Sequence, residues 1–234
     1  MTEPAPNTPE QDGINLYQEK SLHIALKGWY AQPGDRFEVP VAGAVIDLVR
    51  DDLLIEIQTS NFSALKRKLP RLLDDYRVRV VHPIAQARWI VKLGRDGKQQ
   101  SRRKSPKKGS VYHLFSELVY LHQLMLHPNL SVEVLLIHDE EVRCDDGKGS
   151  WRRKGWSICD RRLLAVQDTA VFGSAADLVD LLPPDLPTAF TTADLARAIG
   201  QRRRIAQQMT YCLKHMGVIA MVGKQGNAHV YQRV

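Results

Sequence analysis

Residues 41–62 (VAGAVIDLVRDDLLIEIQTSNF) carry the clearest alternation of apolar and polar positions in the chain. Runs of valine, leucine and isoleucine lie on both sides of Asp51 and Asp52, and this pattern predicts a β-hairpin with a two-residue polar turn. The register follows by counting outward from the turn. The expected pairs are Arg50 with Leu53, Val49 with Leu54, Leu48 with Ile55 and Asp47 with Glu56.

The last of these pairs places two carboxylates opposite each other. Because side chains alternate between faces, Gln58 is expected on the face of Glu56, and Ile46, Leu48, Ile55 and Ile57 on the other. Like charges directly across a sheet are destabilising, so strands this apolar need compensation for the pair. A divalent cation would supply it, since Mg²⁺ is typically held by one or two carboxylates. The alternative is that Asp47 or Glu56 faces solvent on a half-exposed sheet.

Helical patterns flank the hairpin. Residues 15–30 predict a helix that carries Glu19, which could reach the carboxylates if the helix packs on the sheet. Residues 65–76 have leucines at helical spacing, with Pro70 expected to kink or break the helix, and a strand is expected over 77–93.

This order of helix, strand, acidic hairpin, helix and strand resembles the PD-(D/E)XK restriction-endonuclease-like superfamily over residues 14–94. Members hold Mg²⁺ with an acid on one strand and a (D/E)xK triplet on the next. The resemblance matches Asp47 and Glu56 to the metal-binding acids and Glu19 to an additional acid on the first helix. It implies an α/β fold with a mixed sheet flanked by helices, and a Mg²⁺- or Mn²⁺-dependent nuclease.

Gln58 departs from the family pattern because it stands where the lysine is expected. The resemblance gives Gln58 the role of orienting the attacking water, yet glutamine supplies no positive charge. Either a nearby cation such as Lys20 or Lys66 compensates, or the reaction is slow or absent.

The middle of the chain predicts further elements and two basic loops. Residues 95–110 contain almost no apolar residue and are expected to form a solvated, mobile loop that could contact phosphates. A helix is expected over 111–127, an apolar strand over 131–139 and a second basic loop over 147–156. Prolines in residues 183–187 (PPDLP) mark a linker.

Residues 190–234 predict two helices followed by two strands. Thr191 or Thr192 is expected to cap the first helix, Gly200 to end it and Gly217 to follow the second. The buried stripe of the second helix is expected to contain Ile205, Met209, Cys212, Leu213 and Met216.

That order of elements resembles a winged helix-turn-helix. One exposed helix face, together with the turn between the strands, then presents the residues expected to contact DNA: Arg202, Arg203, Arg204, Gln207, Gln208, Tyr211, Lys214 and Lys224. Winged helices also mediate protein contacts, which is the alternative.

Charge favours a nucleic-acid partner. The 234 residues contain 33 Lys and Arg against 26 Asp and Glu, a net charge of +7. Residues 197–234 hold seven Lys or Arg and no Asp or Glu, so this segment alone carries +7. A solvated surface usually mixes both signs, whereas a one-sign surface attracts phosphates.

The cysteines and the hydropathy suggest a soluble, cytoplasmic protein. Three cysteines without a CxxC pair are expected to be reduced thiols. No apolar run approaches the ~18 residues of a membrane helix, and no nucleotide-binding motif is present. The expected organisation is a disordered tail at 1–13, a nuclease-like domain at 14–182 and a winged-helix domain at 188–234.

Together these features predict a Mg²⁺-dependent endonuclease that acts on double-stranded DNA. Because cutting both strands needs two active sites, a homodimer is expected. The alternatives are a nuclease fold that has lost catalysis and acts as a DNA-binding or regulatory protein, and a nuclease directed at RNA.

Overall fold

A mixed sheet of long strands organises most of the chain in the computed structural model, which describes residues 21–234. Its elements are α1 (Ser21–Tyr30), β1 (Arg36–Val41), β2 (Ala44–Arg50), β3 (Leu53–Ile57), η1 (Phe62–Ala64), α2 (Leu65–Lys68), α3 (Pro70–Leu73), β4 (Arg77–Leu93), β5 (Gln99–Lys104), η2 (Val111–Leu114), α4 (Phe115–Leu118), η3 (Leu124–Leu126), β6 (Leu130–Cys144), η4 (Trp151–Arg153) and β7 (Ser157–Phe172).

The sheet has seven strands in the order β1-β2-β3-β4-β6-β7, with β5 paired to β4. Strands β1, β2 and β3 form an antiparallel meander, and β4 then runs parallel to both β3 and β6. The parallel pairing is possible because the helical segments α2–α3 and η2–α4–η3 carry the chain back between these strands. The α/β class expected from the sequence is therefore confirmed.

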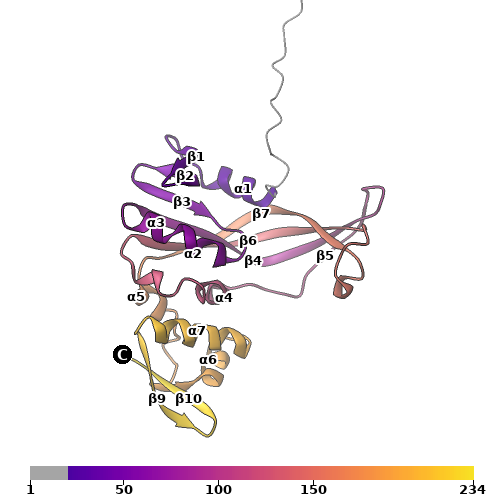
Figure 1. Cartoon of the computed structure of the whole chain (residues 1–234). Helices are drawn as coiled ribbons and strands as arrows, with labels where there is room; N and C mark the ends of the chain where they lie inside the picture. The colour runs from indigo at the N-terminus through magenta and orange to yellow at the C-terminus, as the bar shows by residue number, and fades with distance from the viewer. Residues whose placement is uncertain (1–20) are drawn as a thin grey trace, which may run out of the picture.

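Two apolar clusters cover the sheet. The smaller cluster joins Leu22 and Leu26 of α1 to Leu48, Ile55 and Ile57. The larger cluster contains the buried residues of α2, α3 and α4 and continues into the C-terminal elements. Figure 1 shows α1 along the sheet and α4 between the sheet and the C-terminal elements.

The prediction that Ile46 shares the face of Leu48 is wrong, since Ile46 packs in the larger cluster. The reason lies in the neighbouring strand. On β1, Val39 pairs with Ile46 and Phe37 pairs with Leu48. Glu38, which lies between Phe37 and Val39, has a φ of 51°, and this left-handed residue interrupts the regular alternation of side chains between the two faces of the sheet.

Pro70 divides its helix as expected: α2 ends at Lys68 and α3 begins at the proline. The helix expected over 111–127 is instead broken into η2, α4 and η3.

The expectation of a loop over all of 95–110 is also wrong. Residues 99–104 form β5, which pairs with Trp89–Leu93 of β4. This part of β4 extends beyond the residues that pair with β3, so its edge is free to accept another strand whatever its polarity.

The C-terminal unit follows β7. Its elements are α5 (Ala175–Val179), β8 (Ala189–Thr191), α6 (Thr192–Ala198), α7 (Arg203–His215), β9 (Ile219–Gln225) and β10 (Ala228–Arg233), with a three-stranded sheet in the order β8-β10-β9. Thr191 caps α6 through a reciprocal pair of hydrogen bonds with Asp194, and Gly200 and Gly217 have positive φ after the two helices, as expected. The predicted buried stripe of α7 is confirmed.

Cys144 and Cys159 form a disulfide between β6 and β7, so the expectation of reduced thiols is wrong for this pair. The antiparallel pairing brings their Cα atoms to 6.0 Å, within bonding reach. Their spacing of 15 residues gives no sign of this, because the register of the two strands is a tertiary property. Cys212 is a buried free thiol.

Candidate functional site

The predicted hairpin register is confirmed for its first three pairs, Arg50↔Leu53, Val49↔Leu54 and Leu48↔Ile55. The ladder ends before the expected pair of Asp47 and Glu56. There, the Oδ2 atom of Asp47 accepts the backbone N–H of Ile57 at 2.7 Å. A side chain thus replaces a backbone acceptor at the end of the hairpin, and both carboxylates lie at this point.

Asp47 is held by cationic or protic groups from α1. His23 Nε2 lies 3.2 Å from Asp47 Oδ2, and Lys27 Nζ lies 3.9 Å from Asp47 Oδ1. Lys27 also donates to Glu38 at 2.8 Å. Burial raises the pKa of Asp47, but the hydrogen bonds from His23 and from the Ile57 N–H, with the nearby charges, lower this pKa below its ordinary value. Asp47 is therefore ionised at neutral pH.

Glu56 has the opposite electrostatic environment. Its side chain is 13% exposed, and its pKa is raised, first by burial and then by the negative charge of Asp47. Lys68 Nζ donates to Glu56 Oε2 at 2.6 Å and to the Val45 carbonyl at 2.7 Å, which offsets part of that rise in pKa. The charge of Asp47 thus acts on Glu56, although the β2–β3 ladder ends before these two residues.

Lys68 is the functional candidate that the sequence did not single out. The basic flank of residues 66–68 is visible in the sequence, but only the fold shows which cation turns inward. Lys66 instead lies over the Tyr120 ring, 5.5 Å from its centroid. Lys20, the other expected cation, and Glu19 lie outside the described residues.

The segment after β3 is fixed by its own hydrogen bonds. The Gln58 side-chain amide donates to the Asn61 carbonyl at 2.9 Å, and the Gln58 carbonyl accepts from His82 Nδ1 at 2.7 Å. Burial lowers the pKa of His82, so its ring is neutral and carries its proton on Nδ1. The Phe62 ring packs edge-on against His82 at 4.9 Å between centroids.

The donor set at this site suits a hard cation in part. Asp47 and Glu56 offer carboxylate oxygens, and Mg²⁺ usually needs only one or two, with water completing its shell. Within residues 21–234, no three His, Cys, Asp or Glu side chains are grouped in a way that could hold a metal ion. The acids that the described residues offer at this site are Asp47 and Glu56.

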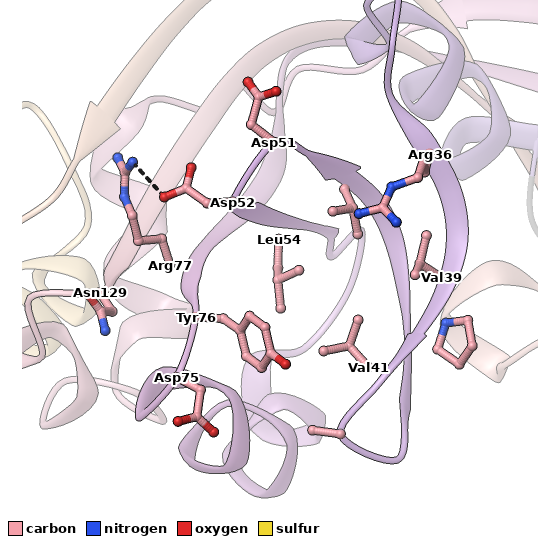
Figure 2. A pocket seen from close by; sticks show the side chains of 13 residues that line it. Arg36, Val39, Val41, Asp51, Asp52, Leu54, Asp75, Tyr76, Arg77 and Asn129 are labelled. Carbon is pink, nitrogen blue, oxygen red and sulfur yellow. Dashed lines mark hydrogen bonds and ion pairs between the residues drawn. The ribbon is translucent and has the colours of Figure 1, made fainter.

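A second hollow lies at the other end of the hairpin, around its turn. Its volume is about 700 Å³, and Figure 2 shows Asp51, Asp52 and Asp75 around it with Arg36. Asp52 pairs with Arg77 at 3.4 Å, and both side chains are well exposed. These solvated charges give no electrostatic sign of a catalytic site.

The basic face expected on α7 is divided by the fold. Arg202, Arg204 and Gln208 face the first part of the chain, where Ser116 Oγ donates to Gln208 at 3.1 Å. Arg203, Gln207, Tyr211 and Lys214 line a groove against the β9–β10 strands. Lys224 is exposed on β9 opposite His229. The sequence placed all eight on one DNA-contacting surface, whereas the structure gives two surfaces.

None of the helices in the part of the chain described is both long and apolar enough to span a membrane. No solved structure matches the chain significantly. An uncharacterized protein of Treponema pallidum is 36% identical over 222 residues, covering 94% of this chain and 87% of that protein.

Residues 20–173 match a family described as a domain of unknown function, DUF8091. The match ends one residue after β7, where the C-terminal unit begins. The chain belongs to the DUF8091 family.

Proposed function

We propose that the protein is a metal-dependent endonuclease that hydrolyses phosphodiester bonds in DNA. The observation that carries this proposal is the end of the β2–β3 hairpin. There a partly buried, ionised Asp47, a partly buried Glu56 of raised pKa and the Lys68 ammonium meet. Two acids with pKa values displaced in opposite directions beside a cation are typical of catalytic sites.

In this proposal each side chain has a defined task. Asp47 and Glu56 would hold Mg²⁺ or Mn²⁺, which would supply positive charge near the phosphate as negative charge develops on it. His23 and the Ile57 N–H orient the Asp47 carboxylate. Lys68 contributes the positive charge that Gln58 lacks, and Gln58 lies two residues after Glu56 to orient water. Glu19 remains a predicted third acid.

The order of elements supports the resemblance to PD-(D/E)XK nucleases. An α-helix, a three-stranded meander, a helical segment and a strand parallel to β3 follow one another in the predicted sequence of elements. We further propose that the C-terminal unit is a winged helix and that Arg203, Gln207, Lys214 and Lys224 contact duplex DNA. A homodimer and a cytoplasmic location remain predictions from the sequence.

A catalytically inactive DNA-binding protein is the second candidate. The observation that favours it is Gln58, whose side-chain amide is bonded to the Asn61 carbonyl rather than to either acid. In that case the charges around Asp47 would serve stability alone.

Incubation of the purified protein with supercoiled plasmid and Mg²⁺, Mn²⁺ or EDTA separates the two candidates. We expect nicking or cutting only with metal, and a loss of at least about a hundredfold for Asp47→Ala. Asp52→Ala is the matched control, because it removes an exposed acid from the same hairpin. Equal inertness of wild type and Asp47→Ala, with salt-dependent duplex binding by both, would establish the second candidate.

A further inference from the structure

The segment Ser105–Gly109 is fixed against β4 at both ends. The Ser105 N–H donates to the Arg88 carbonyl at 2.7 Å, and the Gly109 N–H donates to the Ala85 carbonyl at 2.9 Å. A side chain at position 109 would collide with that Ala85 carbonyl, so the close approach requires glycine. The backbone that carries the exposed Lys107 and Lys108 is thus held in place between these anchors.

A cleft of about 820 Å³ separates this loop from α7. Lys107 and Lys108 line it from one part of the molecule, and Arg202 and Arg204 from the other. Among the described residues, none of the four has an acidic partner within 4.0 Å. The acid in the lining, Glu117, accepts the Phe62 N–H. The positive charge of the cleft therefore favours binding of a polyanion.

The size and lining of the cleft favour a single strand over a duplex. Its volume is in the range of pockets that enclose small organic ligands, about 300–1,000 Å³, which is room for a few nucleotides. Tyr120 in its lining is 38% exposed, and bases stack on exposed aromatic rings in single-strand sites. The combination of grouped cations and an exposed aromatic ring is typical of such sites.

The cleft also borders the segment that follows β3 and the candidate active site. Asn61 lines it, and the Asn61 carbonyl accepts the side-chain amide of Gln58. A strand lying between the Lys107–Lys108 loop and α7 would thus lead toward the hairpin that carries Asp47 and Glu56.

We propose that this cleft binds single-stranded DNA, and that the proposed nuclease acts on duplexes that carry a single-stranded segment. The binding statement stands on the cleft itself, and the statement on cleavage rests on the proposed function. Arg202, which precedes α7, and Arg204 and Gln208 of α7 would then serve the single strand, while the groove on the opposite side of α7 serves the duplex.

Fluorescence anisotropy with a labelled twelve-nucleotide oligo-dT in EDTA tests the binding without requiring catalysis. We expect Lys107→Glu/Lys108→Glu to weaken binding by at least about tenfold and Tyr120→Ala by about fivefold or more. Lys148→Glu/Arg152→Glu makes the same charge change in the exposed loop after β6 and is the matched control, expected to change binding less than twofold. Binding of a blunt duplex should be unchanged by Tyr120→Ala.

Cleft variants that bind the oligonucleotide no more weakly than the control pair would overturn the proposal, as would a wild type that prefers the blunt duplex. If the protein binds single strands but cleaves no DNA with either metal, the proposed nuclease function is wrong. The assignment of the cleft as a single-strand site would then still hold. Thermal unfolding of each variant, expected to match wild type because all these side chains are exposed, confirms that the fold is intact.

Discussion

The charged side chains at the end of the β2–β3 hairpin and those on the surface of α7 differ in their exposure and in their pairing. Asp47 and Glu56 are 17% and 13% exposed, and each has cationic or N–H partners at short distance. On α7, Arg203 and Lys214 are exposed and have no acidic partner within 4.0 Å in residues 21–234. A largely buried, paired charge fixes geometry and is costly to unpair, whereas an exposed cation mainly attracts a polyanion and responds to salt.

The largest expected effect on stability comes from unpairing Glu56. We expect Lys68→Met to lower the free energy of unfolding at pH 8 by about 3 kcal/mol, because the Glu56 carboxylate, only 13% exposed, is then left without its cation. Urea unfolding measures this change. The matched control is Arg67→Met, since Arg67 is exposed on the same short helix and should cost less than about 0.5 kcal/mol.

Adding Glu56→Gln to Lys68→Met should recover more than half of the lost stability, since no charge is then left alone. If Lys68→Met is no more destabilising than Arg67→Met, the Lys68–Glu56 ion pair contributes nothing to stability. The proposed difference between the charges of the hairpin and those of α7 would then be wrong.

The two acids should respond to pH with opposite signs. The pKa of Asp47 is lowered in the fold, so its charge stabilises the protein above the unfolded pKa of about 3.9 and this contribution is lost as the pH falls. Asp47→Asn should therefore cost about 2 kcal/mol at pH 7 and progressively less on acidification.

For Glu56 the sign reverses, because its pKa is raised in the fold and wild-type stability declines as the pH rises above the unfolded pKa of about 4.3. Glu56→Gln should thus raise the melting temperature at pH 8 and leave it unchanged near pH 4. Melting curves by circular dichroism between pH 3.5 and 8 record both series, with Asp51→Asn in the exposed turn as control. Changes of melting temperature with the same sign for Asp47→Asn and Glu56→Gln at pH 8 would contradict the opposite electrostatic environments of the two acids.

The smallest effect on stability should come from α7, where the consequence is in binding. Arg203→Ala and Lys214→Ala should change the free energy of unfolding by less than about 0.5 kcal/mol. If each cation contacts a phosphate, its removal should lower the salt dependence of duplex binding by about one ion per contact. Anisotropy at several salt concentrations measures this slope. A slope equal to that of wild type would remove these residues from the proposed duplex surface.

The sequence by itself determined several local elements and the first three pairs of the β2–β3 hairpin. Alternating apolar residues and two turn aspartates were enough to pair Leu48 with Ile55, and Pro70 was enough to end α2. The ends of the C-terminal helices followed from Thr191, Gly200 and Gly217, and the buried stripe of α7 followed from the helical spacing of its apolar residues. These features depend on backbone conformation and on periodicity, which neighbouring residues decide.

Only the tertiary structure decided which distant groups meet. It placed Lys68, and not Lys66, on Glu56, joined Cys144 to Cys159 and made β5 from a segment of polar residues. It also turned one face of α7 toward Lys107 and Lys108, which divides the basic surface in two. Such contacts depend on how strands and helices pack across the whole chain, and no short stretch of sequence encodes them.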